Sequence, residues 1–347
     1  MLPRSTFQER AERASRDGPL LIMDPENLQY LCSSSAPTAM ILPRDGDPVL
    51  LSSRMEAERA RHESRVGDVR EFQRSEVELR EGESCIFESL AGAVLRVAGE
   101  LEIGGISYDS VGEELRRDLA PLDPSRTDAV ERMRVIKSRE EIDLIREAHG
   151  IALEAYEEVV PEIDEDSTEI SIAGRIYESI MSRGAMPAFD PIVAFGESSA
   201  FPHYATGKRR LGRSSVVMID MGAKVEGYCS DITRMLLLDG GPAEGTLEVV
   251  RSAIEEASAV LEPGVALSEV DRAARRALGE ESPYFIHGLG HGLGLGVHEM
   301  PVIVPHSDEE LEDGMVFTVE PGLYYPGRYG VRWEEDFVCW DGEASMI

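Results

Sequence analysis

Apolar residues recur along the chain with two different periods, and each period predicts one type of element. After Ser138-Arg-Glu-Glu, which is typical of a capped helix start, apolar residues return every three to four positions. This spacing predicts a helix from Ser138, and similar spacing predicts helices over 84–100, 168–183, 247–261 and 269–278. Short apolar runs predict strands; the clearest are PLLIMD, TAMIL, VVMIDMGA, MVFTVEPGLY and VRWEEDFVCW.

The chain is long enough for two domains, because domains commonly contain about 100–200 residues and this sequence has 347. Its first third mixes short strands and helices, as in a small α/β domain. The segment PLDPSRTDAV contains two prolines and several turn-forming residues, so we interpret it as the link between domains. The predicted domains are therefore 1–125 and 126–347.

Five side chains in the second domain indicate a metal site. Each lies in a segment typical of a strand or a tight loop; they are Asp220, Asp231, His291, Glu320 and Glu334. Four carboxylates and one imidazole form a hard, oxygen-rich donor set, which suits divalent ions of the Mn or Co type. Two ions bridged by carboxylates can supply a hydroxide nucleophile at neutral pH. The sequence therefore predicts a metal-dependent hydrolase.

The acidic residues are expected to meet in pairs. Asp220 follows the apolar run VVMI, which would bury it, and a buried carboxylate is costly unless it is paired or bound to metal. A turn around 225–227 can bring Asp231 beside it on a returning strand, where the two like charges need a cation between them. For either residue alone, a salt bridge or a turn cap is the alternative. Glu320 and Glu334 flank a second turn and form a similar pair.

The segment HGLGHGLGLGVHE concentrates histidine and glycine. Four of the seven histidines lie between Phe201 and Glu299, and glycine lets the backbone approach a bound group closely. The segment lacks the GxxxxGK[ST] pattern of a phosphate-binding loop. We interpret it as part of the metal site.

The charge of the chain excludes one class of partner. The formal net charge is −31, and lysine occurs three times, whereas arginine supplies the other 32 basic residues. Such a chain lacks the basic surface that nucleic acid requires, so no nucleic-acid partner is expected. No apolar run approaches the ~20 residues of a membrane helix, and the polar N-terminus has no signal-peptide core. The four scattered cysteines are typical of a reduced protein, and we expect a cytoplasmic location without membrane contact.

The same acidity predicts a requirement for salt. Many Asp and Glu with few Lys are typical of adaptation to high intracellular salt, where the Debye length falls to about 3 Å at 1 M and self-repulsion is screened. An acidic protein from a high-GC genome is the alternative. We expect dilution from molar to millimolar KCl to unfold the protein, measured as a fall in its thermal midpoint. An unchanged midpoint would reject halophilic adaptation.

Five segments of the second domain occur in a specific order and spacing. They are SSAFPHY, VMIDMGAKVEGYCSDITRM, HGLGHGLGLGVHEMP, FTVEPGLY and GVRWEED. Together they resemble the pita-bread metallopeptidases, specifically the Xaa-Pro branch of prolidases and proline-specific aminopeptidases. The resemblance covers 130–347 well and the first domain loosely. It implies an α+β chain with a C-terminal pita-bread (creatinase/aminopeptidase) fold and a smaller N-terminal creatinase-type α/β domain.

The resemblance also implies how two divalent ions would be bound. Asp220, Asp231 and Glu334 would hold one ion, and Asp231, His291, Glu320 and Glu334 the other. Mn²⁺ is the first expectation and Co²⁺ the second, and Zn²⁺ or Fe²⁺ also suits such a site. Water bridging the ions would attack the carbonyl of an Xaa-Pro bond in a dipeptide or at a peptide N-terminus.

Further roles follow from the same resemblance. Glu320 would act as general base. His298 and His203 would hold the substrate carbonyl and stabilise the oxyanion, and His287 would line the proline pocket. Arg332 would orient carboxylates from behind the ligands. The family also implies a homodimer.

Some positions and alternatives stay open. Trp333 stands where the family usually has an aliphatic residue, and Met235 where threonine is common. Arg328 is a candidate for recognising the carboxylate of a dipeptide, so dipeptidase and aminopeptidase activity are both compatible with the sequence. A methionine-aminopeptidase-like enzyme, a metal-free creatinase-like hydrolase and a non-catalytic pita-bread binding module are the competing interpretations. The complete set of five ligands argues against the last two.

Overall fold

A computed structural model describes residues 3–238 and 241–347, and the chain divides into two compact units between Arg134 and Val135. The helices and strands of the first unit are, in chain order, α1 (Arg4–Ala14), β1 (Leu20–Ile22), α2 (Pro25–Cys32), β2 (Ala39–Leu42), β3 (Val49–Ser53), α3 (Ala57–Glu63), β4 (Asp68–Phe72), β5 (Cys85–Ile86), α4 (Leu90–Glu100), β6 (Ser107–Tyr108), α5 (Glu113–Asp118), β7 (Ser125–Arg126) and α6 (Ala129–Val135).

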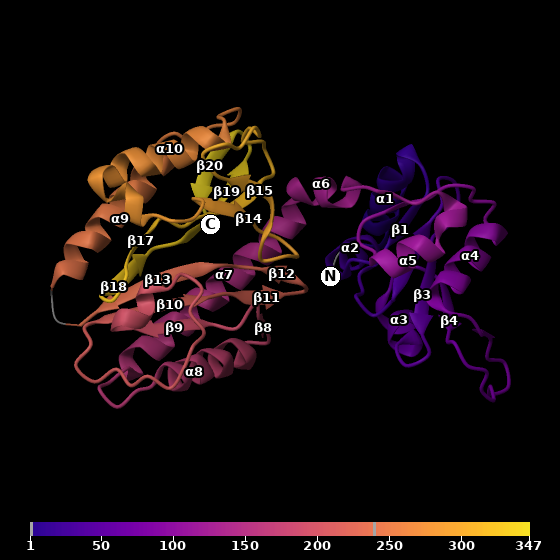
Figure 1. Cartoon of the computed structure of the whole chain (residues 1–347), viewed down its shortest axis with the longest axis horizontal. Helices are drawn as coiled ribbons and strands as arrows, with labels where there is room; N and C mark the ends of the chain where they lie inside the picture. Colours follow the sequence, from indigo (N-terminus) through magenta and orange to yellow (C-terminus); the bar gives the residue numbers. More distant parts are fainter. Residues whose placement is uncertain (1–2, 239–240) are drawn as a thin grey trace. The chain divides into compact units, whose positions relative to one another are not determined.

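The first unit is built on one mixed sheet with the strand order β5-β4-β3-β2-β1-β6-β7 (Figure 1). The pairs β1–β2 and β2–β3 are antiparallel and the other pairs are parallel. The strand predicted for TAMIL is confirmed as β2, in which Ile41 pairs with Val49 of β3. One face of helix α4, including Val94 and Val97, packs into the core beside these strands, which explains its apolar spacing.

The boundary between the units falls later than the predicted position of 125/126. Part of the segment interpreted as a link forms β7, which pairs in parallel with β6 at the edge of the first sheet. Helix α6 follows, and Arg134 near its end donates a hydrogen bond to Asn27 in α2. The proline-containing segment therefore belongs to the first unit, because strand pairing absorbs it.

The second unit contains the longer helices and most of the strands. In chain order its elements are α7 (Arg139–Val159), α8 (Glu169–Ser182), β8 (Met186–Pro187), β9 (Ile192–Phe195), β10 (Val216–Met221), β11 (Ala223–Val225), β12 (Tyr228–Cys229), β13 (Ile232–Leu237), α9 (Pro242–Ser258), α10 (Leu267–Leu278), β14 (Gly290–Gly292), β15 (Glu299–Ile303), β16 (Val316–Val319), β17 (Gly322–Tyr325), β18 (Tyr329–Arg332), β19 (Glu335–Trp340) and β20 (Glu343–Met346).

These elements form two helix-covered sheet regions, as the pita-bread fold requires. Figure 1 shows α9 and α10 outside the strands β14, β15, β19 and β20, and α8 outside β9, β10 and β13. Apolar side chains of α7 and α8 pack on β9 and β10, and those of α9 and α10 pack on β16 and β19. Burying each large apolar side chain contributes about 1.5–3 kcal/mol, so the two cores hold the sheets in register. The α+β prediction is confirmed.

Helix starts were predicted with uneven success. Ser138 forms the predicted capping box with Glu141 at the start of α7, and Thr168 caps α8. Helix α9, however, begins at Pro242 and ends at Ser258, so the range 247–261 is wrong at both ends. Proline suits the first turn of a helix because its missing N–H has no partner there in any case.

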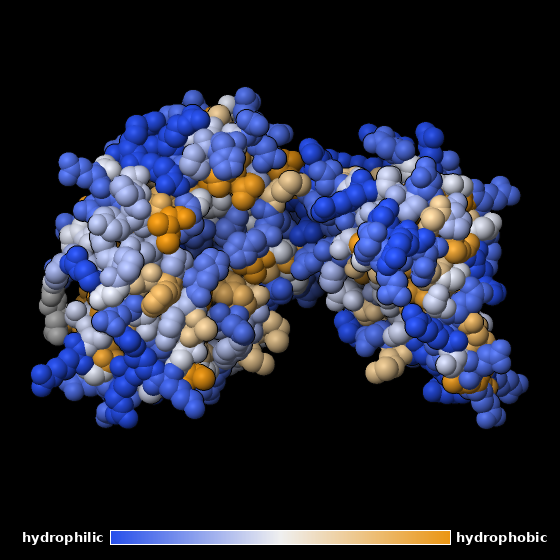
Figure 2. All heavy atoms as spheres, viewed as in Figure 1, coloured by the Kyte–Doolittle hydropathy of each residue, from blue (hydrophilic) through white to orange (hydrophobic). Residues whose placement is uncertain are grey.

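The surface is consistent with the composition. Figure 2 shows a predominantly hydrophilic face on which apolar residues are scattered in small groups. Within the described residues, no helix is both long and apolar enough to cross a membrane.

Candidate active site

The five predicted ligands lie in strands or directly beside the ends of strands. Asp220 lies in β10 and His291 in β14, whereas Asp231 precedes β13, Glu320 follows β16 and Glu334 precedes β19. All five line one cavity of about 920 Å³. The other four predicted site residues line the same cavity; they are His203, His287, His298 and Arg332.

The strands that carry the two aspartates return on each other, as in the predicted hairpin. β10 and β13 are antiparallel neighbours, but Thr233 rather than Asp231 lies opposite Asp220. The turn around Glu226 and Gly227 joins β11 to β12, and both residues have positive φ, 50° and 95°, as in a type I′ turn. The β11–β12 hairpin therefore places Asp231 directly before the first residue of β13, beside Asp220 but not opposite it in the strand pairing.

The two glutamates are also brought together by an antiparallel strand pair. β16 and β19 are antiparallel, with Val319 opposite Glu335, so Glu320 and Glu334 lie at adjacent ends of this pair. The hairpin of β17 and β18 fills the sequence between them. The Glu334 N–H also donates to the Thr233 carbonyl at 3.2 Å, which links the glutamate strands to the aspartate strands.

The potential ligand atoms are close enough to share a cation. Asp231, His291 and Glu334 each place one such atom within 4.8 Å of the others. His291 Nε2 lies 3.5 Å from Glu320 Oε1 and 3.9 Å from Asp231 Oδ2. Gly290 makes this approach possible, because a Cβ atom there would lie 1.9 Å from the Thr318 carbonyl oxygen. The glycine-rich segment thus allows close backbone packing beside the histidine, whereas its predicted role in approaching a bound group stays a prediction.

His291 is in the form that a metal ligand needs. Burial lowers its pKa to about 4, so the imidazole is neutral at physiological pH. Its Nδ1 lies 3.2 Å from the Gly292 carbonyl, and because a carbonyl can only accept, Nδ1 carries the proton. The lone pair of Nε2 then faces the carboxylates.

The carboxylates form a site with a deficit of positive charge. Burial raises the pKa of Asp231 and of Glu334 well above the usual range, and neighbouring acids raise both further. Burial also raises the pKa of Asp220, and that of Glu320 to about 8, although Arg332 opposes both shifts. Among the described residues, Asp220 Oδ1 and Asp231 Oδ1 are buried and have no hydrogen-bond partner. Unpartnered carboxyl oxygens beside a neutral imidazole fit divalent cations, which would stabilise the ionised form of these acids.

Arg332 is held behind the acidic cluster. Its Nη2 is hydrogen-bonded to Asp220 Oδ2, its Nε donates to Thr233 Oγ1 at 2.9 Å, and its Nη1 donates to the Tyr324 hydroxyl at 2.9 Å. Thr233 in turn donates to Glu334 Oε2 at 2.7 Å. The arginine therefore orients carboxylates on both strand pairs.

Tyr324 extends this network to His287. Burial lowers the pKa of His287 to about 4, and its Nδ1 donates to the Gly288 carbonyl at 2.8 Å. Nε2 must then accept from the Tyr324 hydroxyl, 2.9 Å away. The sequence did not single out Tyr324 or Thr233; both stand within quoted motifs, but their partners are distant in the chain.

The remaining histidines face the open part of the cavity. The His298 ring lies 4.1 Å from the His291 ring, and burial lowers the pKa of His298. His203 is exposed and follows Pro202 in the lining. The rest of the wall is largely apolar and includes Phe189, Ile192, Val297, Met300, Val302 and Val304.

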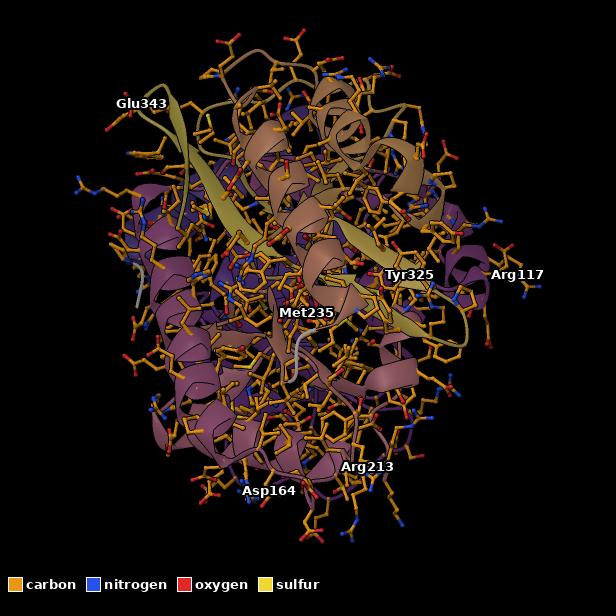
Figure 3. The ribbon with its side chains drawn as sticks, turned by 90° about the vertical axis from the view of Figure 1, so that its left-hand side faces the viewer. Arg117, Asp164, Arg213, Met235, Tyr325 and Glu343 are labelled. Carbon is orange, nitrogen blue, oxygen red and sulfur yellow. The ribbon has the colours of Figure 1, made fainter. Side chains whose placement is uncertain are left out.

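The departures from the family pattern lie outside the cavity lining. Met235 is buried near the centre of the second unit, whereas Asp164 and Arg213 lie at its periphery (Figure 3). The Trp333 ring lies under the Arg251 guanidinium at 4.0 Å. Arg328 lies over the Tyr325 ring at 5.6 Å and is not part of the lining, so it does not reach a substrate carboxylate there.

Glu335 and Asp336 have defined partners that the sequence did not reveal. Glu335 pairs with Arg234 at 2.8 Å. Asp336 is fully buried, lies 2.8 Å from His149 Nδ1 and accepts from the Asp231 N–H at 3.2 Å. This pair supports the segment that carries Asp231.

Comparison with known proteins gives consistent matches for both units. Residues 143–341 match metallopeptidase family M24, and residues 4–136 match the creatinase/prolidase N-terminal domain. The Xaa-Pro dipeptidase of Pyrococcus furiosus is 33% identical over 336 residues, covering 94% of this chain and 92% of the relative. The crystal structure of the prolidase from Pyrococcus horikoshii superposes with a TM-score of 0.86 at 28% identity, covering 99% of this chain and 97% of that one. The X-Pro aminopeptidase from Thermotoga maritima gives a TM-score of 0.82 at 29% identity, covering 97% of each chain.

Proposed function

The chain belongs to metallopeptidase family M24, and from this premise we propose that it is a prolidase-type enzyme that hydrolyses the peptide bond before proline. The single observation that carries the proposal is the convergence of four carboxylates and one neutral imidazole on one cavity. The named relatives act on Xaa-Pro substrates, which supports this choice of bond.

We propose two divalent ions as cofactors, with Mn²⁺ the first expectation. Asp220, Asp231 and Glu334 would hold one ion, and Asp231, His291, Glu320 and Glu334 the other. The unpartnered oxygens of Asp220 and Asp231 support this assignment. When bound, such ions lower the pKa of a water molecule between them and polarise a substrate carbonyl.

The protein groups around the cavity would position and protonate the substrate. Glu320 would take a proton from the attacking water and pass it toward the leaving nitrogen. His298 and His203 would donate to the substrate carbonyl oxygen as negative charge develops on it. His287, held by Tyr324, would border the proline ring, for which the apolar wall provides contact.

The charged residues of the cavity lining indicate which substrate lengths the site accepts. Arg332 is the one Lys or Arg among the described residues that line it, and its guanidinium is already occupied by Asp220, Thr233 and Tyr324. A dipeptide places its carboxylate directly after proline, where a cation would be needed to pair it. The site therefore favours peptides that continue beyond proline over dipeptides. A homodimer, a cytoplasmic location and halophilic adaptation stay predictions.

The test combines metal analysis with a matched set of substrates at molar KCl. We expect Ala-Pro-Ala and Ala-Pro amide to be cleaved at least as fast as Ala-Pro, because the cavity offers no unpaired cation for a carboxylate within its described lining. We expect no cleavage of Met-Ala and loss of all activity with a chelator. Activity restricted to Met-Ala would favour the methionine enzyme, and protein without activating metal would favour the binding module.

A further inference from the structure

A buried ammonium group lies next to the proposed active site without lining it. Lysine occurs three times in this acidic chain, and the side chain of Lys137 is only 1% exposed. Its Nζ lies 2.9 Å from Glu299 Oε1 and donates to the Val135 carbonyl at 3.3 Å. Burying a charge costs free energy unless the charge is paired. The ion pair with Glu299 therefore accounts for the buried position of Lys137.

Glu299 connects the wall of the cavity to the loop that carries His298. It directly follows His298, it pairs with Gly292 across the β14–β15 ladder, and it lines the cavity. Its second oxygen accepts from the Gly296 N–H at 3.3 Å. The carboxylate therefore ties together the loop of residues 292–299, which joins His291 to His298.

The loop is shaped to admit this ion pair. A Cβ atom at Gly294 would lie 2.2 Å from Glu299 Oε1 and 3.2 Å from Lys137 Cε. No side chain fits at that position without displacing the pair. Gly294 thus allows the glycine-rich segment to pack closely around the Lys137–Glu299 ion pair.

Lys137 itself is rigidly held. Its N–H donates to the Gly314 carbonyl at 2.8 Å, and the next residue, Ser138, caps helix α7. The backbone of Lys137 is therefore anchored, and its ammonium group is paired with Glu299 Oε1. Without the ammonium group, Glu299 would lose its ion pair, which is a buried charge interaction at the end of the loop that carries His298.

We infer that Lys137 is a positioning residue that holds His298 in place through Glu299. This inference rests on the proposed function, in which His298 stabilises the developing oxyanion. A group that acts only as charge develops affects kcat more than KM. Small displacements of such groups cost rate steeply, up to about 10²-fold for roughly 1 Å.

The test compares lysine variants of the Mn²⁺-loaded enzyme. We expect Lys137→Met to lower kcat on Ala-Pro-Ala roughly 10- to 100-fold, with little change in KM and full Mn²⁺ content by mass spectrometry. Lys137→Arg keeps a cation and should recover most of kcat. Lys208→Met, at an exposed lysine, is the matched control and should match the wild type. Unchanged kcat in Lys137→Met, or a loss of kcat that follows loss of Mn²⁺, would overturn the inference.

Two further measurements keep the inference testable. If Lys137→Met does not fold, the double variant with Glu299→Gln removes both charges and leaves no buried charge alone. It should show the same loss of kcat, and wild-type kcat would overturn the inference. If the wild type binds Mn²⁺ but cleaves no Xaa-Pro peptide, the proposed function fails. Histidine ring resonances of the zinc-loaded protein then decide the positioning role, because only Lys137→Met, and not Lys208→Met, should shift His298.

Discussion

Replacing Asp231 by asparagine is expected to lower kcat on Xaa-Pro substrates by roughly 10³-fold or more, because it removes a carboxylate that we place between two cations. Asp231 is buried, its Oδ1 has no partner among the described residues, and it lies within reach of both His291 and Glu334. An amide oxygen carries no net charge and cannot balance two divalent ions. The local fold should persist, because the shape of the side chain is kept and the backbone N–H still donates to Asp336.

Metal content decides how the loss of activity is interpreted. We expect fewer than two Mn²⁺ ions per chain in Asp231→Asn, measured by mass spectrometry after exchange into metal-free buffer. Glu334→Gln should behave in the same way. Asp308→Asn changes an exposed aspartate and should keep full activity and metal content. Substantial turnover of Asp231→Asn with both metal positions filled would contradict the ligand assignment.

Replacing His298 by alanine is expected to lower kcat by about 10²- to 10³-fold while leaving metal binding intact, because one donor to the oxyanion is lost. His298 lines the cavity, and its ring is 4.1 Å from that of His291. Burial lowers its pKa, so the neutral imidazole acts as a hydrogen-bond donor rather than as a cation. The effect should fall on kcat, since the interaction strengthens only as charge develops.

The control for this variant is a histidine outside the cavity. His306→Ala changes an exposed ring that does not line the cavity and should leave kcat unchanged. A loss of Mn²⁺ in His298→Ala that parallels the loss of activity would mean that His298 is itself a ligand. Normal kcat would remove it from the proposed mechanism.

Elements that depend on neighbouring residues were predictable from the sequence. The start of α7 was predictable because Ser138 and Glu141 satisfy each other's backbone groups within one turn. The strand that carries Asp220 was predictable because its apolar run is continuous. The nine candidate residues could be chosen from donor chemistry and from the family motifs, and the structure brings them to one cavity.

The errors have a common origin. Residues 125–126 stand in a proline-containing segment that is typical of a loop, and only pairing with β6 makes them a strand. The predicted turn around 225–227 forms and brings Asp231 beside Asp220, but the sequence did not reveal that this turn joins two additional strands, β11 and β12. Such strand pairings depend on residues that are far away in the chain, so local composition does not predict the pairings.

Taken alone, the order of amino acids determined which chemistry is possible, because the donor type of a carboxylate or imidazole belongs to the side chain itself. Folding decided which of these groups meet, how each is charged and what holds it. Thr233 reaches Glu334, and Lys137 reaches Glu299, only after strands from distant parts of the chain have paired. Burial then shifts the proton equilibria of the whole cluster, a property that exists only where solvent has been excluded by tertiary packing.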